Sequence, residues 1–165
     1  MAPANLDERE LAELQSTVAI GWVVVTDSDK PPFGQVLLDG RHLLAADEPR
    51  TVGGQDTGPG PYELLLMALG ACTAMTLRMY ATRKQLPLER VLVRLKHDKV
   101  HAEDCINCEQ AAAMIDRIDR QIELFGPLDE AQRRRLIEIA DKCPVHRTLT
   151  SEVKIATKLA DAAVP

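Results

Sequence analysis

The sequence has few aromatic residues, no long uncharged apolar run and no dense cluster of basic residues. Phe, Trp and Tyr together make up 3 % of its 165 residues, which excludes an aromatic platform for stacking bases or caging cations. No apolar stretch reaches about 18 residues without a charge, so we expect no membrane span. The formal net charge is −5, and no basic stretch is dense enough to follow a phosphate backbone. We therefore expect no nucleic-acid partner.

The composition is that of a folded soluble protein, with 45 % apolar and 27 % charged residues. The acidic start, MAPANLDERELAEL, has no apolar signal-peptide core, so we expect a cytoplasmic protein. In that compartment, four cysteines are more typical of catalysis, redox chemistry or metal binding than of structural disulfides. The length suits one core. We predict a tail or a short amphipathic helix at the start, bounded as residues 1–15, and a single domain over residues 16–160.

The first third of the chain predicts strands followed by a long loop. Residues 16–26, STVAIGWVVVT, are rich in β-branched side chains and predict a strand. Residues 35–47 predict a hairpin with Asp39 and Gly40 at its tip. Residues 48–61 contain four Gly and three Pro and predict a loop. A loop of this length inside a compact domain is often functional.

A long apolar helix is predicted over residues 61–84. Leu and Met side chains lie all around it, which is typical of a helix that is buried on every side. A single domain of this size does not readily surround such a helix, and a symmetric partner would supply the missing cover. We therefore expect a homodimer.

The second half of the chain predicts further strands and one more helix. Alternation over residues 86–101 and over the second half of 115–126 predicts two strands. Residues 128–143 predict a helix that ends before a proline, and residues 151–159 predict a closing strand. The order β-β-β-α-β-β-α-β indicates an α+β fold, with an antiparallel sheet wrapped around a long buried central helix.

Two cysteines are the first candidates for chemistry. Cys72 lies in the middle of the apolar helix, and Cys143 precedes a polar corner that contains His146 and Arg147. A nearby cation favours the thiolate, which is the nucleophilic form. A second thiol can capture a sulfenic acid as a disulfide. The same residues also fit two unrelated core cysteines, because a free cysteine packs as a small apolar side chain.

The stretches GPGPYELLLMALGACTAMTLRMYATRK and DKCPVHRTL resemble the OsmC/Ohr family of thiol peroxidases, and most of all its OsmC-like subgroup that also occurs fused to hydrolases. The resemblance covers residues 16–157. It implies an intertwined homodimer in which each half contributes a long central helix. It also implies that Cys72 attacks an organic hydroperoxide and that Cys143 resolves the sulfenic acid, in defence against oxidative or osmotic stress. An unidentified dithiol would be the reductant, and no cofactor would be required.

The family also uses an Arg and a Glu to hold the reactive thiolate. In its peroxidase members the Glu directly follows a Pro, ten positions before the Cys, whereas this chain has Tyr62 there and Glu63 one position later. Glu63 is therefore the candidate, and the alternative is a carboxylate that stabilises the helix start. Arg41 is the preferred Arg because GRHLLAADEP resembles the subgroup, and Arg50 in the Gly/Pro-rich loop remains open.

A second constellation lies in HDKVHAEDCINCE, which contains His97, His101, Cys105 and Cys108. Two thiols and two imidazoles are an accepted zinc ligand set, and Cys-x-x-Cys is also a redox motif. We select Cys105, Cys108 and His101 as candidate zinc ligands.

The leading prediction is an enzyme, a peroxiredoxin-like reductase of organic hydroperoxides. One alternative is a dimeric binding module for an apolar ligand, without peroxidase activity. The other is a zinc-binding protein centred on Cys105 and Cys108.

Overall fold

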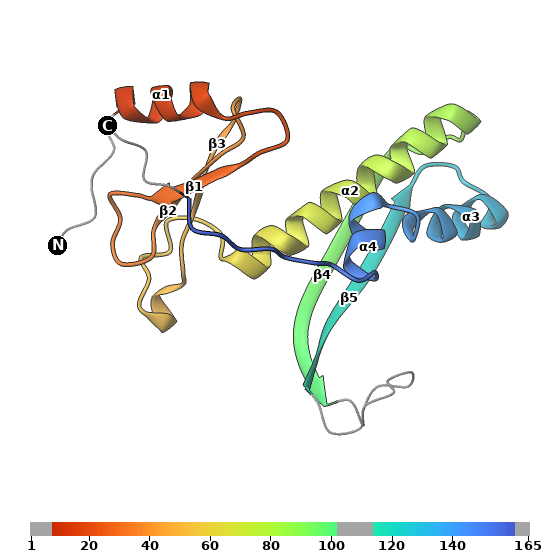
Figure 1. The fold of residues 1–165 in the computed structure, drawn as a ribbon. Coiled ribbons are helices and arrows are strands. Elements are labelled where there is room, and N and C mark those ends of the chain that lie inside the picture. Colours follow the sequence, from red (N-terminus) through yellow and green to blue (C-terminus); the bar gives the residue numbers. More distant parts are fainter. Residues whose placement is uncertain (1–7, 102–113, 161–165) are drawn as a thin grey trace. The chain divides into compact units, whose positions relative to one another are not determined.

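The computed structural model describes residues 8–101 and 114–160 of the chain (Figure 1). These residues divide into two compact units, with the boundary between Leu65 and Leu66, and each unit is described by itself. The elements in chain order are α1 (Glu8–Thr17), β1 (Val24–Asp27), β2 (Gln35–Leu38), β3 (Leu43–Ala46), the 3-10 helix η1 (Arg50–Val52), α2 (Pro61–Lys84), β4 (Arg90–His101), β5 (Met114–Phe125), α3 (Glu130–Ala140) and α4 (Pro144–Leu149).

The first unit is built on a three-stranded antiparallel sheet in the order β1-β2-β3. The hairpin predicted over residues 35–47 is confirmed. Asp39 holds its tip because the carboxylate accepts hydrogen bonds from the backbone N–H groups of Arg41 (2.9 Å) and His42 (2.6 Å). Gly40 follows with a φ of 84°, a left-handed conformation that costs glycine little.

The strand predicted over residues 16–26 is wrong in its first half. Residues 16 and 17 end α1, and β1 begins only at Val24. Gly21 lies between them with a φ of 84°, which interrupts an extended backbone whatever the β-propensity of its neighbours. Of the two predictions made for the N-terminal stretch, the short helix is therefore the one observed.

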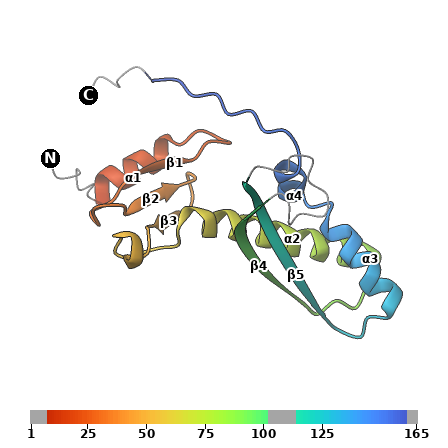
Figure 2. The same cartoon turned by 90° about the horizontal axis from the view of Figure 1, so that it is seen from below.

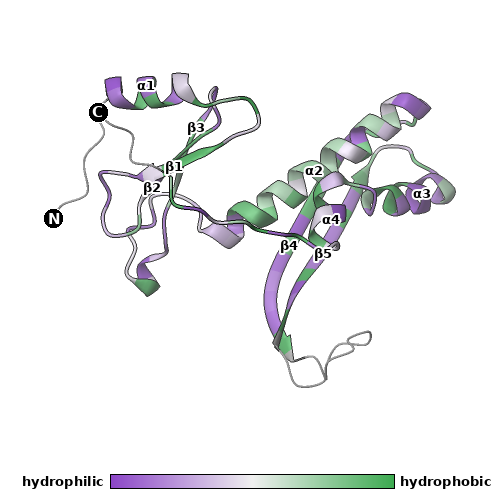
Figure 3. Ribbon diagram, viewed as in Figure 1, coloured by the Kyte–Doolittle hydropathy of each residue, from purple (hydrophilic) through white to green (hydrophobic). Residues whose placement is uncertain are grey.

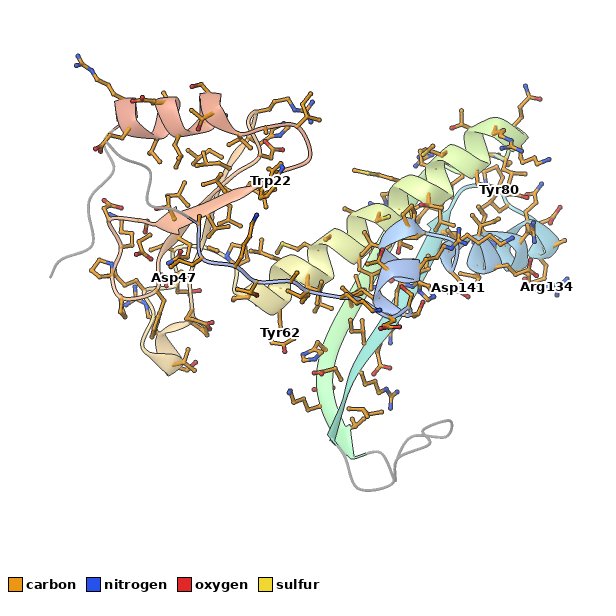
Figure 4. The ribbon with its side chains drawn as sticks, viewed as in Figure 1. Trp22, Asp47, Tyr62, Tyr80, Arg134 and Asp141 are labelled. Carbon is orange, nitrogen blue, oxygen red and sulfur yellow. The ribbon has the colours of Figure 1, made fainter. Side chains whose placement is uncertain are left out.

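The loop after β3 is organised around Asp47, a buried carboxylate (Figure 4). It accepts hydrogen bonds from the backbone N–H groups of Glu48 (2.8 Å), Gln55 (3.1 Å) and Thr57 (3.2 Å), and from the Thr57 hydroxyl (2.9 Å). Burial alone would raise the pKa of Asp47, but these donors outweigh it and hold that pKa below its ordinary value. The predicted long loop is thus ordered by one anion.

The bounds of α2 are those predicted from the sequence, and its residues form two stripes on opposite sides of the helix. The buried stripe consists of Leu69, Thr73, Leu77 and Ala81. The second, which we call the Met stripe, consists of Met67, Ala71, Met75 and Met79, and all four are exposed. Figure 3 shows how apolar α2 is along most of its length. Two residues correspond to about 200° of rotation, so the stripes face apart. The chain alone therefore buries α2 on one side, and burial on every side stays a prediction.

By length and composition, α2 is the one helix of the described residues that is apolar enough to cross a membrane. The core helix of a soluble protein meets the same criteria. The absence of a membrane span accordingly remains a prediction from the sequence.

The second unit packs α2, β4, β5 and α3 around one hydrophobic core (Figure 2). β4 and β5 pair antiparallel along their whole length, from Arg90 opposite Phe125 to His101 opposite Met114. The buried core residues are Leu77, Ala81, Leu88, Leu128, Leu136, Ile139 and Ala140.

The helix predicted over residues 128–143 is confirmed as α3. Its start is fixed by a capping box, in which the Asp129 carboxylate accepts from the Gln132 N–H (2.7 Å) and the Gln132 side chain accepts from the Asp129 N–H (3.1 Å). This start and the buried Leu136 place the end of α3 against the core, three residues before Cys143.

The C-terminal part contains one helix that was not predicted and one predicted strand that is wrong. Residues 144–149 form the short helix α4, because proline suits a first helical position as well as it ends a preceding helix. The strand predicted over residues 151–159 is wrong, because this segment forms no ladder with another described strand and is exposed throughout. The α+β class with antiparallel sheets is confirmed, and the wrapped helix and the dimer stay predictions.

Candidate active site

Cys72 lies on α2 at the boundary between the two stripes. Ala71 before it belongs to the Met stripe, and Thr73 after it belongs to the buried stripe. Each helical residue advances by about 100°, so the Cys72 side chain leaves the helix between the interior and the surface. Its thiol is free and half-buried. Part of this side chain is therefore open to a reactant.

Cys143 is the residue that immediately precedes α4, and it is completely buried. Pro144 at the first helical position directs the next two backbone N–H groups, of Val145 and His146, toward the Cys143 sulfur. No full capping hydrogen bond forms, but these N–H dipoles act on the sulfur. Such an environment favours a negative charge on Cys143.

The structure brings the two thiols together, although 71 positions separate them in the sequence. Burial raises the pKa of Cys72, and the neighbouring Cys143 thiol raises that pKa further. Burial acts on Cys143 in the same direction, but the polar groups beside its sulfur, which are the Cys72 thiol, the His146 N–H and the Thr73 hydroxyl, outweigh it and hold the pKa of Cys143 below its ordinary value. Of the two thiols, Cys143 is thus the one whose surroundings favour the charged form.

Two further residues, Thr73 and Arg120, adjoin the thiol pair and were not selected from the sequence. Arg120 on β5 donates to the Thr73 hydroxyl (3.0 Å) and to the Asp141 carboxylate (2.6 Å), and Thr73 is among the groups that lower the pKa of Cys143. Asp141 follows α3 directly (Figure 4). A sequence signal did exist, because Arg120 shares its strand face with Ile118 and Ile122, where an apolar residue is expected.

A cavity of about 260 Å³ lies in the second unit beside these residues. Its walls combine apolar and ionisable side chains. They are Leu69, Asp116, Ile118, Arg120, His146, Leu149 and Thr150. Arg120 and His146 therefore face this cavity while they also adjoin the surroundings of Cys143.

The predicted Glu and Arg candidates all belong to the first unit. The Glu63 carboxylate accepts a hydrogen bond from the Gly60 N–H at 2.9 Å, as a helix-start carboxylate does. Arg41 is exposed in the β2–β3 turn, and Arg50 is exposed in η1. The structure does not relate the two units to each other, so a role for Glu63 or Arg41 at the thiol pair remains a prediction.

The predicted zinc ligands fall on or beside the part of the chain that is not described. Cys105 and Cys108 lie outside the described residues, and so does the side chain of His101, whose backbone ends β4. His97 lies on β4 and contacts Asp116 at 2.8 Å. Among the described residues, no group of three His, Cys, Asp or Glu side chains is placed to hold a metal ion.

Comparisons with solved structures reveal the same fold in several proteins. An OsmC-like protein from Mycoplasma pneumoniae is 18 % identical, with a TM-score of 0.60 over 78 % of this chain and 85 % of that one. The organic hydroperoxide resistance protein OsmC from Legionella pneumophila is 18 % identical, with a TM-score of 0.57 over 80 % of this chain and 91 % of that one. An organic hydroperoxide resistance protein from Elizabethkingia anophelis is 15 % identical, with a TM-score of 0.56 over 80 % and 90 %.

The comparison with curated proteins found no match. The family model described as OsmC-like protein matches residues 54–158, which include α2, β4, β5, Cys72 and Cys143. This match covers more than half of the chain and agrees with the fold of the solved structures. The chain therefore belongs to the family of OsmC-like proteins.

Proposed function

We propose that this protein is a thiol peroxidase that reduces organic hydroperoxides with Cys72 and Cys143. The observation that supports this most is that two reduced thiols on separate elements lie close enough to shift each other's pKa. Neither α2 nor the segment before α4 requires a cysteine for its own folding. Two thiols in contact can cycle between dithiol and disulfide, which is the chemistry that peroxide reduction needs.

In the proposed reaction, two electrons pass from the thiols to the peroxide. The Cys72 thiolate attacks one oxygen of R–O–O–H, the O–O bond breaks, and the alkoxide leaves and takes a proton to become an alcohol. Cys72 is then a sulfenic acid. The Cys143 thiolate attacks the Cys72 sulfur, the S–O bond breaks, and hydroxide leaves as water once protonated. A dithiol reductant returns two electrons and two protons to the disulfide.

The order of these two roles follows from exposure. Cys143 has 0 % of its surface exposed, whereas Cys72 is half-buried. A peroxide therefore meets Cys72 first, even though the pKa of Cys143 is the lower one. The lowered pKa suits the second step, in which Cys143 is the nucleophile and no external reactant has to reach it.

The first step requires a cation beside Cys72, because burial raises the pKa of this thiol. No cation stands among the described groups that shift it most. We assign the missing charge to Arg41, with Arg50 as the alternative and Glu63 as its carboxylate partner. An Arg within a few ångströms would favour the thiolate and stabilise the charge that develops on the leaving oxygen.

We also propose that the protein acts as a homodimer. Met67, Met75 and Met79 are 58 %, 65 % and 73 % exposed on one side of α2, although their side chains are apolar. Residues 151–159 add a second exposed apolar set, Val153, Ile155 and Leu159, with mostly strand-like spacing. A second copy that covers the Met stripe would bury this surface and enclose the exposed side of Cys72 in an apolar slot.

The test is peroxide consumption under a dithiol reductant, with cumene hydroperoxide and hydrogen peroxide compared. The natural chain should consume cumene hydroperoxide faster, because the slot around Cys72 is apolar. Cys72→Ser should lose turnover by about a thousandfold or more, since the nucleophile is removed. Cys143→Ser should react once and then accumulate a Cys72 sulfenic acid that overoxidises.

The outcomes separate the enzyme from the alternatives. A Cys105→Ser/Cys108→Ser chain serves as the control, and its rate should equal that of the natural chain. Consumption that persists in Cys72→Ser, or that never exceeds the rate of a free thiol, would contradict the proposal.

A second candidate function is a dimeric binding module for an apolar ligand. The raised pKa of Cys72 favours it, because a protonated thiol is a poor nucleophile. On this view the Met stripe and the thiol pair line a ligand slot without turnover. Stoichiometric binding of a long-chain alcohol, without peroxide consumption, would select this candidate.

A further inference from the structure

Arg120 has an unusual position for a charged side chain. On β5 it points to the same face as Ile118 and Ile122, and only 13 % of its side chain is exposed. The neighbours on the opposite face, Arg117 and Asp119, are exposed. An inward-facing cation is costly unless its N–H groups are paired. The hydrogen-bond partners of Arg120 therefore indicate its role.

The guanidinium group of Arg120 binds three groups at once, one on α2 and two at the end of α3. It donates to the Asp141 carboxylate at 2.6 Å, to the backbone carbonyl of Ala140 at 3.4 Å and to the Thr73 hydroxyl at 3.0 Å. Asp141 supplies the opposite charge, and its own side chain is 64 % exposed. The contact with Thr73 is different, because it joins the cation to a fully buried hydroxyl next to Cys72.

The Thr73 hydroxyl links Arg120 to the surroundings of Cys143. A guanidinium group has donors only, so the Thr73 oxygen must accept from Arg120, and the hydroxyl proton remains for another acceptor. In a helix that proton commonly goes to the carbonyl four residues earlier, but here the Thr73 hydroxyl lies near the Cys143 thiol and helps to lower its pKa. The Ala140 carbonyl that Arg120 binds also accepts from the Cys143 N–H at 3.3 Å, which places Cys143 beside this pair. Thr73 and Cys143 are both 0 % exposed, so bulk water does not compete for the Thr73 hydroxyl.

We propose that Arg120 and Thr73 form a relay that holds Cys143 as a thiolate aimed at Cys72, which makes them positioning residues for the step in which the disulfide forms. This inference rests on the two-cysteine reaction proposed above and adds to it the groups that prepare the second nucleophile. Arg120 touches neither thiol. Its charge acts by polarising the Thr73 O–H bond, which strengthens the hydrogen bond to sulfur.

The electrostatics of Cys143 agree with this relay. Burial by itself would raise the pKa of Cys143, yet donors that include Thr73 hold the pKa below its ordinary value. A buried thiolate is protected from peroxide but remains in contact with Cys72. The step then requires only that the Cys143 sulfur attacks the Cys72 sulfur while hydroxide leaves.

The first test measures the titration of Cys143 and needs no peroxide. In the chain Cys72→Ser/Cys105→Ser/Cys108→Ser, Cys143 is the only thiol, and thiolate absorbance near 240 nm follows its ionisation. Thr73→Val keeps the shape of the side chain but removes the hydroxyl, so the midpoint should rise by about one pH unit, which means about tenfold less thiolate below both midpoints. Thr73→Ser keeps the hydroxyl and should restore the parent midpoint.

Arg120→Gln tests whether the charge of Arg120 acts on Cys143 through the Thr73 hydroxyl. It should raise the midpoint by less than Thr73→Val, because Thr73 can still donate to sulfur. The double variant should titrate like Thr73→Val alone, since the charge acts through the hydroxyl. The exposed Thr82 on the same helix gives the matched control, Thr82→Val, which should leave the midpoint unchanged. Equal midpoints for Thr73→Val and the parent, with unchanged circular dichroism, would overturn the relay.

The second test separates this inference from the proposed function. In chains that keep Cys72 and Cys143, a sulfenic-acid trap and disulfide formation are followed after one equivalent of cumene hydroperoxide. Thr73→Val should form the sulfenic acid as fast as the natural chain but close the disulfide about tenfold more slowly near neutral pH. If the natural chain forms no sulfenic acid, the peroxidase proposal fails and the titration result stands by itself. If both steps are equally fast in both chains, the relay fails and the peroxidase proposal survives.

Discussion

The two units of the chain are stabilised in different ways. The second unit has a closed apolar core, with Leu77 and Leu136 completely buried, and it holds both described thiols. The first unit has Leu38 and Ala46 as its buried apolar residues and is organised instead by hydrogen bonds to Asp47. Its exposed large apolar residues include Ile20, Trp22, Val23, Val25, Leu43 and Leu44.

This difference indicates that the two thiols are held by a rigid unit. It also indicates that apolar surface of the first unit stays exposed in a single chain. The second unit can hold two sulfur atoms in contact, because helices and strands around its core fix their positions. The first unit presents more apolar surface than an isolated soluble unit usually does. Its contribution to the reaction, in the proposal above, is a cation for Cys72, because none stands among the described groups that shift the pKa of Cys72 most.

The largest expected effect tests whether the first unit takes part in the chemistry. Arg41→Ala should slow Cys72 oxidation by cumene hydroperoxide by about a hundred- to a thousandfold, the range for loss of one group that stabilises a developing charge. Arg50→Ala is the matched control and should change the rate by less than about threefold. The reverse pattern would assign the role to Arg50. No effect of either change would confine the chemistry to the second unit.

The second prediction compares the two cores. Leu77→Ala should lower the free energy of unfolding by about 2–5 kcal/mol, because a leucine surrounded by a closed core leaves a cavity. Leu38→Ala should fall near the lower end of that range, since the thinner core of the first unit can collapse around the change. Urea denaturation gives both values. An equal or larger cost at Leu38 would contradict the contrast drawn between the two units.

The third prediction concerns the Met stripe. Met75→Glu should weaken the homodimer by about a hundredfold, because the interface would bury an unpaired charge. Ala131→Glu, which adds the same charge at an exposed position of α3, should leave the dimer intact. Sedimentation velocity over a range of concentrations measures both. A natural chain that sediments as a monomer at every concentration would contradict the proposed homodimer.

The smallest expected effect concerns the anion that organises the first unit. The folded-state pKa of Asp47 lies below its unfolded value, so its contribution to stability is full above about pH 4 and is lost as the pH falls through the folded pKa. Asp47→Asn should therefore lower the melting temperature by several degrees at pH 7, and this difference should shrink toward pH 3. A difference that stays constant from pH 7 to pH 3 would show that Asp47 acts without its charge.

The sequence predicted the elements whose signals are local. The bounds of α2, the tip of the first hairpin at Asp39 and the helix that became α3 all rest on nearby residues, through periodicity, turn chemistry and capping. Residues 151–159 have the alternation of a strand, but a strand also needs a neighbour, and no other described strand pairs with them. Pro144 follows the end of α3 as expected, but proline also suits the first position of a helix, so this residue alone does not predict α4.

The candidate site could be predicted only in part for a similar reason. Cys72 and Cys143 stand out because of their residue type and the resemblance that surrounds them. Their contact depends on how α2 and α3 pack, which no local pattern contains. Thr73 and Arg120 are ordinary residues whose role arises from a pairing across 47 positions. Arg120 did break the apolar pattern of its strand face, and an inward-facing charge is a reason to look for its partner.

The most direct test of the central claim is to map the cysteines that one equivalent of cumene hydroperoxide oxidises in the fully reduced chain. Rapid quenching, digestion and mass spectrometry should find a disulfide between Cys72 and Cys143, and none should form in Cys72→Ser. A disulfide between Cys105 and Cys108 instead would move the chemistry to the other pair. Slow and scattered oxidation at all four thiols would contradict the account, and the apolar binding module would then be the better description.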